Sequence, residues 1–264
     1  MDMIVCVKQI LDPETPPSAF KVDEAAKKVI PAQGMSPVIN PFDSQAVEAA
    51  LRIRDATGSG KITVLSMGPA SARDAVKHGL AMGADEGILI DDPALADADS
   101  FVSARVLAAA IKKIGAFDVV FCGRQAADWD MGIVGPGLGE LLGVPAVTIT
   151  KSAQATDGHL RVERVLMDGF ETVDVPVPCV VTISNELGDP RYPQLRQIMV
   201  AARKQVVVWT AADLGLTEDD LRSPLKLERL YVPVKESHVE IIEGDTVEEQ
   251  AKNLARRLRE VKLI

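Results

Sequence analysis

Short apolar runs alternate with longer segments of helical spacing along the first part of the chain. The runs MIVCVKQI, KITVLSMG, EGILIDD, FDVVFCG and PAVTIT are typical of buried strands. The segments between them place apolar residues three and four positions apart, beginning near Ser44, Ala70, Ser100 and Val134. Strands that alternate with such helices predict βαβ units and a parallel sheet. Ligands bind sheets of this kind beyond the carboxyl ends of the strands.

The first helical segment carries start and stop signals. Asn40-Pro41-Phe42-Asp43 precedes it and predicts a capped start, because Asn is favoured at the N-cap and Pro in the first turn. Gly58 follows the last periodic residue and predicts the end of the helix.

From about residue 158 the pattern changes. HLRVERVLMDGFETVDVPVP has two β-rich arms joined by Asp168-Gly169, and PCVVTIS follows as an apolar strand. We therefore predict an antiparallel hairpin over residues 158–183, added to the parallel sheet. Residues 1–209 then form one α/β domain. Residues 210–264 show no pattern that would tie 210–245 to this core, and they end in an amphipathic helix, so we predict an arm that packs on a second subunit.

Composition narrows the class of protein. The 264 residues carry a net charge of −9 and contain no block of Lys or Arg, which makes nucleic acid and anionic membranes poor partners. Cys6, Cys122 and Cys179 show no metal-ligand spacing and lie in or beside apolar runs, as expected of buried thiols in a reducing compartment. No apolar run approaches the roughly 20 residues of a membrane span. We expect a soluble cytoplasmic protein without a metal site.

The stretch GRQAADWDMGIVGPGLGELLGVP, residues 123–145, stands where the strand VVFC turns into a helix. Two interpretations are open. The glycines allow close packing, or the backbone N–H groups at the helix start form a cradle for a phosphate. No GxGxxG, P-loop, HExxH or GxSxG motif is present, and His78, His159 and His238 are scattered without a nucleophile. This favours binding, or chemistry that is performed by the ligand itself.

A series of longer motifs is more specific. VKQI, INPFDSQAVEAALRIRD, LSMGP, LAMGADEGILI, GRQAADWD and SNELGDPRYPQLRQIMVAARK follow one another in an order and spacing that resemble the β subunit of electron transfer flavoprotein. The resemblance covers nearly the whole chain, and its last motif is the most distinctive, because neither fold nor packing would dictate it.

The resemblance implies an electron carrier rather than an enzyme. Such β subunits form heterodimers with an α subunit, share an FAD with it, and carry electrons from flavin dehydrogenases to an acceptor such as a membrane quinone oxidoreductase. Their α/β domain, of the adenine nucleotide alpha hydrolase-like class, holds a second nucleotide. This is AMP in most members and a second FAD in the electron-bifurcating branch.

The resemblance also implies site residues. The nucleotide-binding positions are Cys6, Asn40, Met67, Gly68, Gly123, Arg124, Gln125, Asp128, Asp130, Val134, Gly135 and Pro136. Within this set, the N–H groups of Val134 and Gly135 would meet phosphate, and Asp128 is better suited to capping or to the ribose. Residues 185–199 correspond to a loop that docks into a dehydrogenase, with Leu195 as its anchor and Arg191, Tyr192 and Ile198 beside it. A purely structural interpretation, in which Leu195, Ile198 and Met199 seat a short helix in the core, stays open.

The identity of the second nucleotide also stays open. Val134-Gly135-Pro136 and the segment 98–113 resemble the FAD-holding branch more closely, but Trp129 and Met131-Gly132-Ile133 match neither branch. An alternative function is an adenylating or ATP-hydrolysing enzyme of the same architecture. Such enzymes need a Ser-Gly-Gly-type loop after the first strand, where this chain has residues 8–12, KQILD.

Overall fold

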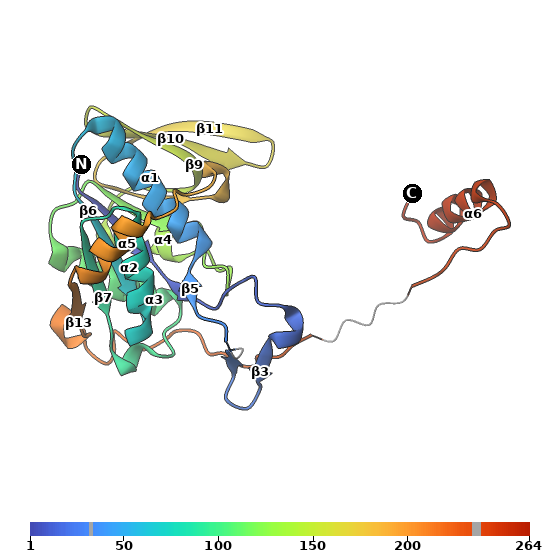
Figure 1. The fold of residues 1–264 in the computed structure, drawn as a ribbon, viewed down its shortest axis with the longest axis horizontal. Helices are drawn as coiled ribbons and strands as arrows, with labels where there is room; N and C mark the ends of the chain where they lie inside the picture. Colours follow the sequence, from blue (N-terminus) through green and yellow to red (C-terminus); the bar gives the residue numbers. More distant parts are fainter. Residues whose placement is uncertain (32–33, 234–238) are drawn as a thin grey trace.

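A nine-stranded sheet forms the centre of the molecule (Figure 1). The structure is a computed structural model that describes residues 1–31, 34–233 and 239–264. The strand order is β11-β10-β9-β12-β8-β1-β6-β7-β13. The strands are β1 (Met3–Val7), β6 (Ile62–Met67), β7 (Glu86–Ile90), β8 (Val119–Gly123), β9 (Ala146–Thr156), β10 (His159–Leu166), β11 (Gly169–Pro176), β12 (Cys179–Ile183) and β13 (Val206–Trp209). Every neighbouring pair from β9 to β13 in this order is parallel, so the predicted parallel sheet is confirmed.

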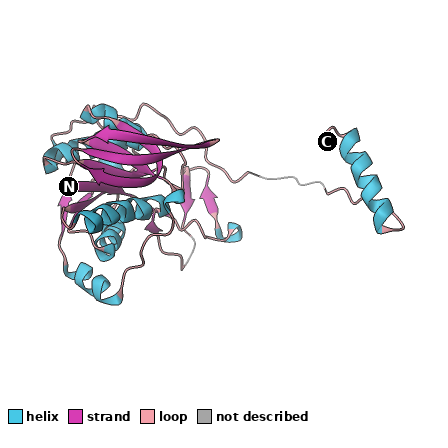
Figure 2. Cartoon of the chain, turned by 90° about the horizontal axis from the view of Figure 1, so that it is seen from above, coloured by secondary structure: helices cyan, strands magenta, loops and turns pink. Residues whose placement is uncertain are grey.

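Helices cover both faces of the sheet (Figure 2). One face carries α1 (Pro41–Thr57), α2 (Arg73–Met82) and α5 (Leu195–Arg203), and the other carries α3 (Ser100–Ile114) and α4 (Val134–Leu142). Short 3-10 turns stand at Pro17–Ala19, Ala70–Ala72, Pro93–Leu95, Asn185–Leu187 and Ala212–Leu214. The expected helices are present, and Gly58 ends α1 in a left-handed conformation with φ of 71°.

Alternation along the buried strands divides the core into two layers. On β1, Met3, Val5 and Val7 pack toward α1 and α2, whereas Ile4 and Cys6 pack toward α3 and α4. This is the period of two that a strand imposes on its side chains. Because the central strands are buried on both faces, their sequences read as continuous apolar runs rather than as alternating ones.

The predicted hairpin over residues 158–183 is present in a modified form. β10 and β11 are antiparallel and are joined at Asp168-Gly169, and β9 extends the antiparallel part to three strands. β12 lies within the predicted range, yet it inserts between β8 and β9 and pairs in parallel with both. The apolar composition of CVVTI suits this central position, which buries all five residues.

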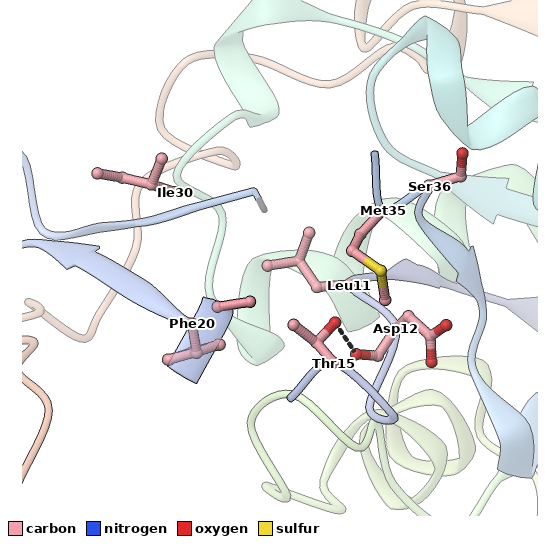
Figure 3. Close-up of a pocket in the computed structure, with 8 residues that line it drawn as sticks. Leu11, Asp12, Thr15, Phe20, Ile30, Met35 and Ser36 are labelled. Atoms are coloured by element: carbon pink, nitrogen blue, oxygen red, sulfur yellow. Dashed lines mark hydrogen bonds between the residues drawn. The ribbon is translucent and has the colours of Figure 1, made fainter. Parts of the chain in front are cut away.

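The segment between β1 and α1, which we call the excursion, contains two small sheets that were not predicted from the sequence. One pairs β2 (Gln9–Ile10) with β5 (Val38–Ile39), and the other is a hairpin of β3 (Lys21–Asp23) and β4 (Lys28–Ile30). Figure 3 shows a hollow inside the excursion, where Leu11, Phe20, Ile30 and Met35 contribute apolar atoms and Thr15 donates to the carbonyl of Asp12 at 2.6 Å. The hollow contains none of the predicted site residues.

The beginning of the predicted arm is attached to the α/β body. Lys113 of α3 donates to the carbonyl of Asp213 at 2.6 Å, and Arg105 donates to that of Asp220. Asp99, which caps α3, also accepts the N–H of Leu225 at 3.1 Å. Contrary to the expectation that nothing ties residues 210–245 to the core, the segment up to Leu225 runs along α3.

The last helix has a different environment. α6 (Val247–Glu260) has no buried side chain, and Figure 1 draws it apart from the sheet. Within the described parts of the chain, no helix combines the length and apolar character needed to cross a bilayer.

Candidate functional site

The predicted nucleotide-binding residues gather at the carboxyl ends of three adjacent strands. Cys6 lies near the end of β1, Met67 and Gly68 at the end of β6, and Gly123 at the end of β8. After β1 the chain builds the sheet outward through β6 and β7, and then returns to add β8 on the other side. The boundary between β1 and β8 is therefore the topological switch point, where open parallel sheets leave a crevice for ligands.

Two thiols line the side of this crevice that faces α3 and α4. Cys6 and Cys122 are both buried, on adjacent strands, and belong to the same core layer. A hydrogen bond with Cys6, together with burial, holds the pKa of the Cys122 thiol well above its usual range. Burial likewise raises the pKa of Cys179 to about 12. The predicted buried cysteines are confirmed.

The loop after β8 is folded on itself by polar contacts. The Gln125 side chain donates to Asp130 Oδ1 at 2.6 Å, and the Lys8 ammonium contacts Asp128 at 2.7 Å. Asp130 has a positive φ of 51°, a conformation that Asp tolerates better than most side chains. The ion pair with Lys8 offsets the charge of Asp128, whereas the uncharged Gln125 amide fixes the Asp130 carboxylate in place.

Asn40 binds this loop instead of capping α1. Its side chain makes no capping bond to the helix, contrary to the sequence expectation. The amide is fully buried, donates to the carbonyl of Gln125 at 2.9 Å and accepts the N–H of Ala127 at 3.2 Å. Asn40 therefore positions the loop, and Pro41 in the first turn leaves one fewer helix N–H in need of a cap.

The start of α4 leaves backbone donors for a ligand. Ile133 precedes the helix and cannot cap it, and no side-chain cap is present, whereas Asp99 caps α3 with two bonds. The N–H groups of the first turn, at Val134 and Gly135, are thus the groups that a phosphate would accept from. The first turn of α4 therefore presents uncapped backbone donors beside the loop after β8.

Gly135 is buried and packs against β12 at the same point, whereas Pro136 is exposed. A Cβ on Gly135 would lie 2.2 Å from the Thr182 Cγ2 atom of β12, so this glycine is required for α4 to approach the sheet. Arg124, on the other side of the loop, donates from its backbone to Ile183 at 2.8 Å and from its side chain to Ser184 at 3.4 Å. Both interpretations of the glycine-rich stretch, packing and anion binding, are compatible with this geometry.

Asp43 is a site residue that the sequence analysis placed only in the capping stretch. Its carboxylate accepts the N–H of Lys8 at 2.7 Å and the N–H of Gly123 at 3.1 Å, and so bridges the ends of β1 and β8. Burial raises the pKa of Asp43 to about 7, although these two N–H groups and the Asn40 side chain oppose the rise. The sequence did contain one indication that Asp43 is buried, because it lies four and eight residues before Val47 and Leu51 on the buried face of α1.

The predicted docking residues divide into two groups. Tyr192 and Leu195 are 88% and 74% exposed, and Ile198 is also exposed. Arg191 instead forms ion pairs with Glu48 and Asp55 of α1, at 2.7 and 2.8 Å. The interpretation in which Leu195, Ile198 and Met199 seat a helix in the core does not fit, because α5 buries only Ala201.

Two of the three histidines, His78 and His159, lie outside the site. His78 is in the middle of α2, where burial lowers its pKa, and His159 is exposed in β10. His238 lies outside the described residues. Among the residues that the structure describes, no group of His, Cys, Asp and Glu side chains could hold a metal ion.

Comparison with known proteins identifies the family. The family model named electron transfer flavoprotein domain matches residues 28–214. The chain is 40% identical to the electron transfer flavoprotein subunit beta of Thermoanaerobacterium thermosaccharolyticum, over 98% of each chain. It is 36% identical to the caffeyl-CoA reductase-Etf complex subunit CarD of Acetobacterium woodii, and 33% identical to the acryloyl-CoA reductase electron transfer subunit gamma of Anaerotignum propionicum, over 100% of each chain.

The chain belongs to the electron transfer flavoprotein family. The similarity extends over the full length of β-type subunits, so the resemblance read from the sequence motifs is confirmed, and the function is electron transfer. The matched region contains β6, β8, α4 and α5, and with them most of the predicted site.

The contact between α1 and the end of β8 predicts that Gly123 tolerates no side chain. A Cβ at this position would lie 2.4 Å from Asp43 Oδ1 and 2.7 Å from Phe42 Cβ. We expect Gly123→Ala to lower the free energy of unfolding by about 1–3 kcal/mol, as overpacking does. Gly169→Ala is the matched control, because a Cβ there meets nothing within 4 Å. Equal urea midpoints for the two variants would contradict the prediction.

The raised pKa of Asp43 predicts a pH-dependent contribution to stability. The folded protein binds this proton more tightly than the unfolded chain, because the pKa rises from 3.8 to about 7. The resulting stabilisation is present below pH 4 and is lost as the pH rises toward 7. We expect the difference in free energy of unfolding between the native protein and Asp43→Asn to shrink from pH 5 to pH 8. A difference that urea titrations find constant over this range would show that the carboxyl is ionised throughout.

Proposed function

We propose that this chain is the β subunit of an αβ heterodimer that shares an FAD with its α subunit and carries electrons from a flavin dehydrogenase to a downstream acceptor, such as a membrane quinone oxidoreductase. The full-length similarity to subunits named as electron transfer flavoprotein β chains carries the proposal. FAD supplies the electron-accepting and electron-donating chemistry when it is bound. The residues of this chain would bind and orient the cofactors and would present a docking surface to the dehydrogenase.

The arm supports the pairing with an α subunit. Val247 and Leu254 on α6 are exposed, as are Val239 and Ile241 before it. An amphipathic helix with no buried side chain leaves its apolar face unpaired in this chain alone. The proposed α subunit would cover this face, whereas the segment up to Leu225 belongs to the α/β body.

The second nucleotide is proposed at the switch point between β1 and β8. Its phosphate would accept from the N–H groups of Val134 and Gly135, and its adenine would lie toward Cys6 and Met67. The ordered loop after β8, held by Asn40, would close over it. AMP and FAD are both candidates for this site. Val134-Gly135-Pro136 resembles the sequence of the FAD-holding branch, whereas Trp129 matches neither branch. Trp129 is more than half exposed, so the core packing of the loop does not depend on it.

Nucleotide stoichiometry tests this assignment. After denaturation of the native αβ complex, we expect either two FAD per heterodimer, as for a bifurcating-type site, or one FAD and one AMP, as for a simple carrier. The bound nucleotides would be separated by chromatography and quantified by absorbance against the protein concentration. A single FAD with no further nucleotide would mean that the loop after β8 is only structural.

The apolar face of α5 is proposed as the surface that docks on the dehydrogenase. Leu195, Ile198, Met199 and Val200 are exposed on this helix, and Tyr192 extends the face on the preceding loop. Because burial of one leucine is worth roughly 1.5–3 kcal/mol, Leu195 alone can set a large part of the affinity for a transient partner. The face is small, as suits a partner that must also leave.

We expect Leu195→Ala to slow electron transfer from the dehydrogenase at least tenfold at low dehydrogenase concentration. Flavin content and melting temperature should stay nearly unchanged, because Leu195 makes little contact with the rest of the chain. Rapid-mixing measurement of FAD reduction in the αβ complex would test this. Leu166→Ala, an exposed leucine at the end of β10, is the control and should leave the rate unchanged. A large loss of thermal stability with normal transfer would assign Leu195 to packing instead.

A further inference from the structure

The segment that carries the proposed docking face has little packing of its own. α5 is nine residues long, and Ala201 is its only buried side chain. Helices of this length are marginal in water, and most helical stability in proteins comes from packing of an apolar face. The apolar face of α5 points away from the body, so other contacts must fix its position.

Glu48 on α1 supplies several of these contacts at the beginning of the segment. Its buried carboxylate accepts the Nε of Arg191 at 2.7 Å, the backbone N–H of Arg191 at 3.1 Å and the Nε of Arg52 at 2.9 Å. Arg52 in turn donates to the carbonyls of Leu187 and Asp189, at 3.0 and 3.5 Å. One carboxylate thus connects α1 to the backbone just before α5.

The charge balance shows that this is a strong arrangement. Burial alone would raise the pKa of Glu48, but the hydrogen bonds from Arg191 and Arg52 outweigh burial and hold the pKa below its usual value. Charge-assisted bonds of this kind are roughly twice as strong as neutral ones. Asp55, seven residues further along α1, accepts the Nη2 of Arg191 at 2.8 Å.

The end of α5 is fixed by a different residue. The ammonium of Lys77 on α2 donates to the carbonyls of Ala201 and Ala202 at 2.8 and 3.1 Å, and also to that of Lys204. These are the carbonyls that a helix leaves without partners at its C-terminus. α2 therefore holds the C-terminal end of α5, and α1 holds the backbone at residues 187–191 that leads into it, while the apolar face of α5 remains exposed.

We propose that Glu48 is a positioning residue for electron transfer, which holds the segment 187–203 so that the apolar face of α5 is preformed for the dehydrogenase. The proposal rests on the docking function assigned above to α5. A preformed helix loses less conformational entropy on binding than one that must be ordered by the partner. Glu48 lies behind the helix, so it acts through Arg191 and Arg52 and not by contact with the partner.

The test is Glu48→Gln in the αβ complex, which keeps the size of the side chain and removes its charge. We expect the KM for the complex, measured as electron acceptor of its own dehydrogenase, to rise about tenfold while kcat and nucleotide content stay nearly unchanged. Amide hydrogen exchange should accelerate in residues 187–203 and not in the central strands. Glu86→Gln is the control. It removes the charge of an exposed side chain on β7 that pairs with Lys61, and it should change neither KM nor the exchange rates.

The outcomes separate this proposal from the docking function. If Leu195→Ala raises KM but Glu48→Gln does not, or if Glu48→Gln accelerates exchange without any change of KM, Glu48 has no positioning role. If neither variant changes KM, the docking function of α5 is wrong. Should Glu48→Gln fail to fold, Arg191→Lys provides the same test. Lys lacks the planar guanidinium with which Arg191 contacts Glu48 and Asp55 together. An unchanged KM in that variant overturns the proposal.

Discussion

The bridge from Asp43 to the ends of β1 and β8 is the contact on which the candidate site depends. The pairing of β1 with β8 ends at Val5 and Phe121, so the backbone N–H groups of Lys8 and Gly123 lie beyond the last partners of these two strands. Asp43 accepts both of them from the first turn of α1. The close approach that this requires excludes a Cβ at Gly123, and it fixes Asn40 beside the loop that it binds. Asp43 therefore joins the strand ends from which the loop after β8 departs, and Asn40, three residues before it, binds the loop itself.

The same helix then organises the second functional surface. Asp43 stands at the beginning of α1 and Glu48 in its middle, about 7.5 Å further along the axis at 1.5 Å per residue. The first holds the crevice, and the second holds the segment before α5. A single rigid helix thus fixes both the proposed nucleotide site and the proposed docking face. Buried carboxylates on a helix are costly unless they are bonded, and in both places the bonds are to backbone or guanidinium groups that need a defined position.

Features that depend on hydrophobic periodicity and turn residues could be predicted from the sequence, whereas features that depend on individual polar contacts could not. Runs such as EGILI and CVVTI identified the central strands, and the Asp168-Gly169 turn identified a hairpin, because burial and turn chemistry leave a pattern in the residue types. The strands of the excursion between β1 and α1 are two or three residues long and leave none. The attachment of residues 210–225 depends on Lys113 and Arg105 donating to backbone carbonyls, which any sequence could offer. The gathering of site residues was predictable from strand ends, whereas the bond of Asn40 to the loop was not, because an Asn before a helix is normally its cap.

α5 and α6 show two ways of leaving an apolar helix face exposed. α5 buries one residue, yet Glu48, Arg191 and Lys77 hold it against the body, so its face has a fixed shape before any partner arrives. α6 buries none, and its ion pair from Arg257 to Glu240 stays within the arm. A partner that binds briefly gains from a small, preformed face, because the ordering cost recurs at every encounter. A permanent subunit bears that cost once and can order a whole arm through a large interface. The polar contacts around α5, and their absence among the described contacts of α6, thus match the two kinds of partner proposed here.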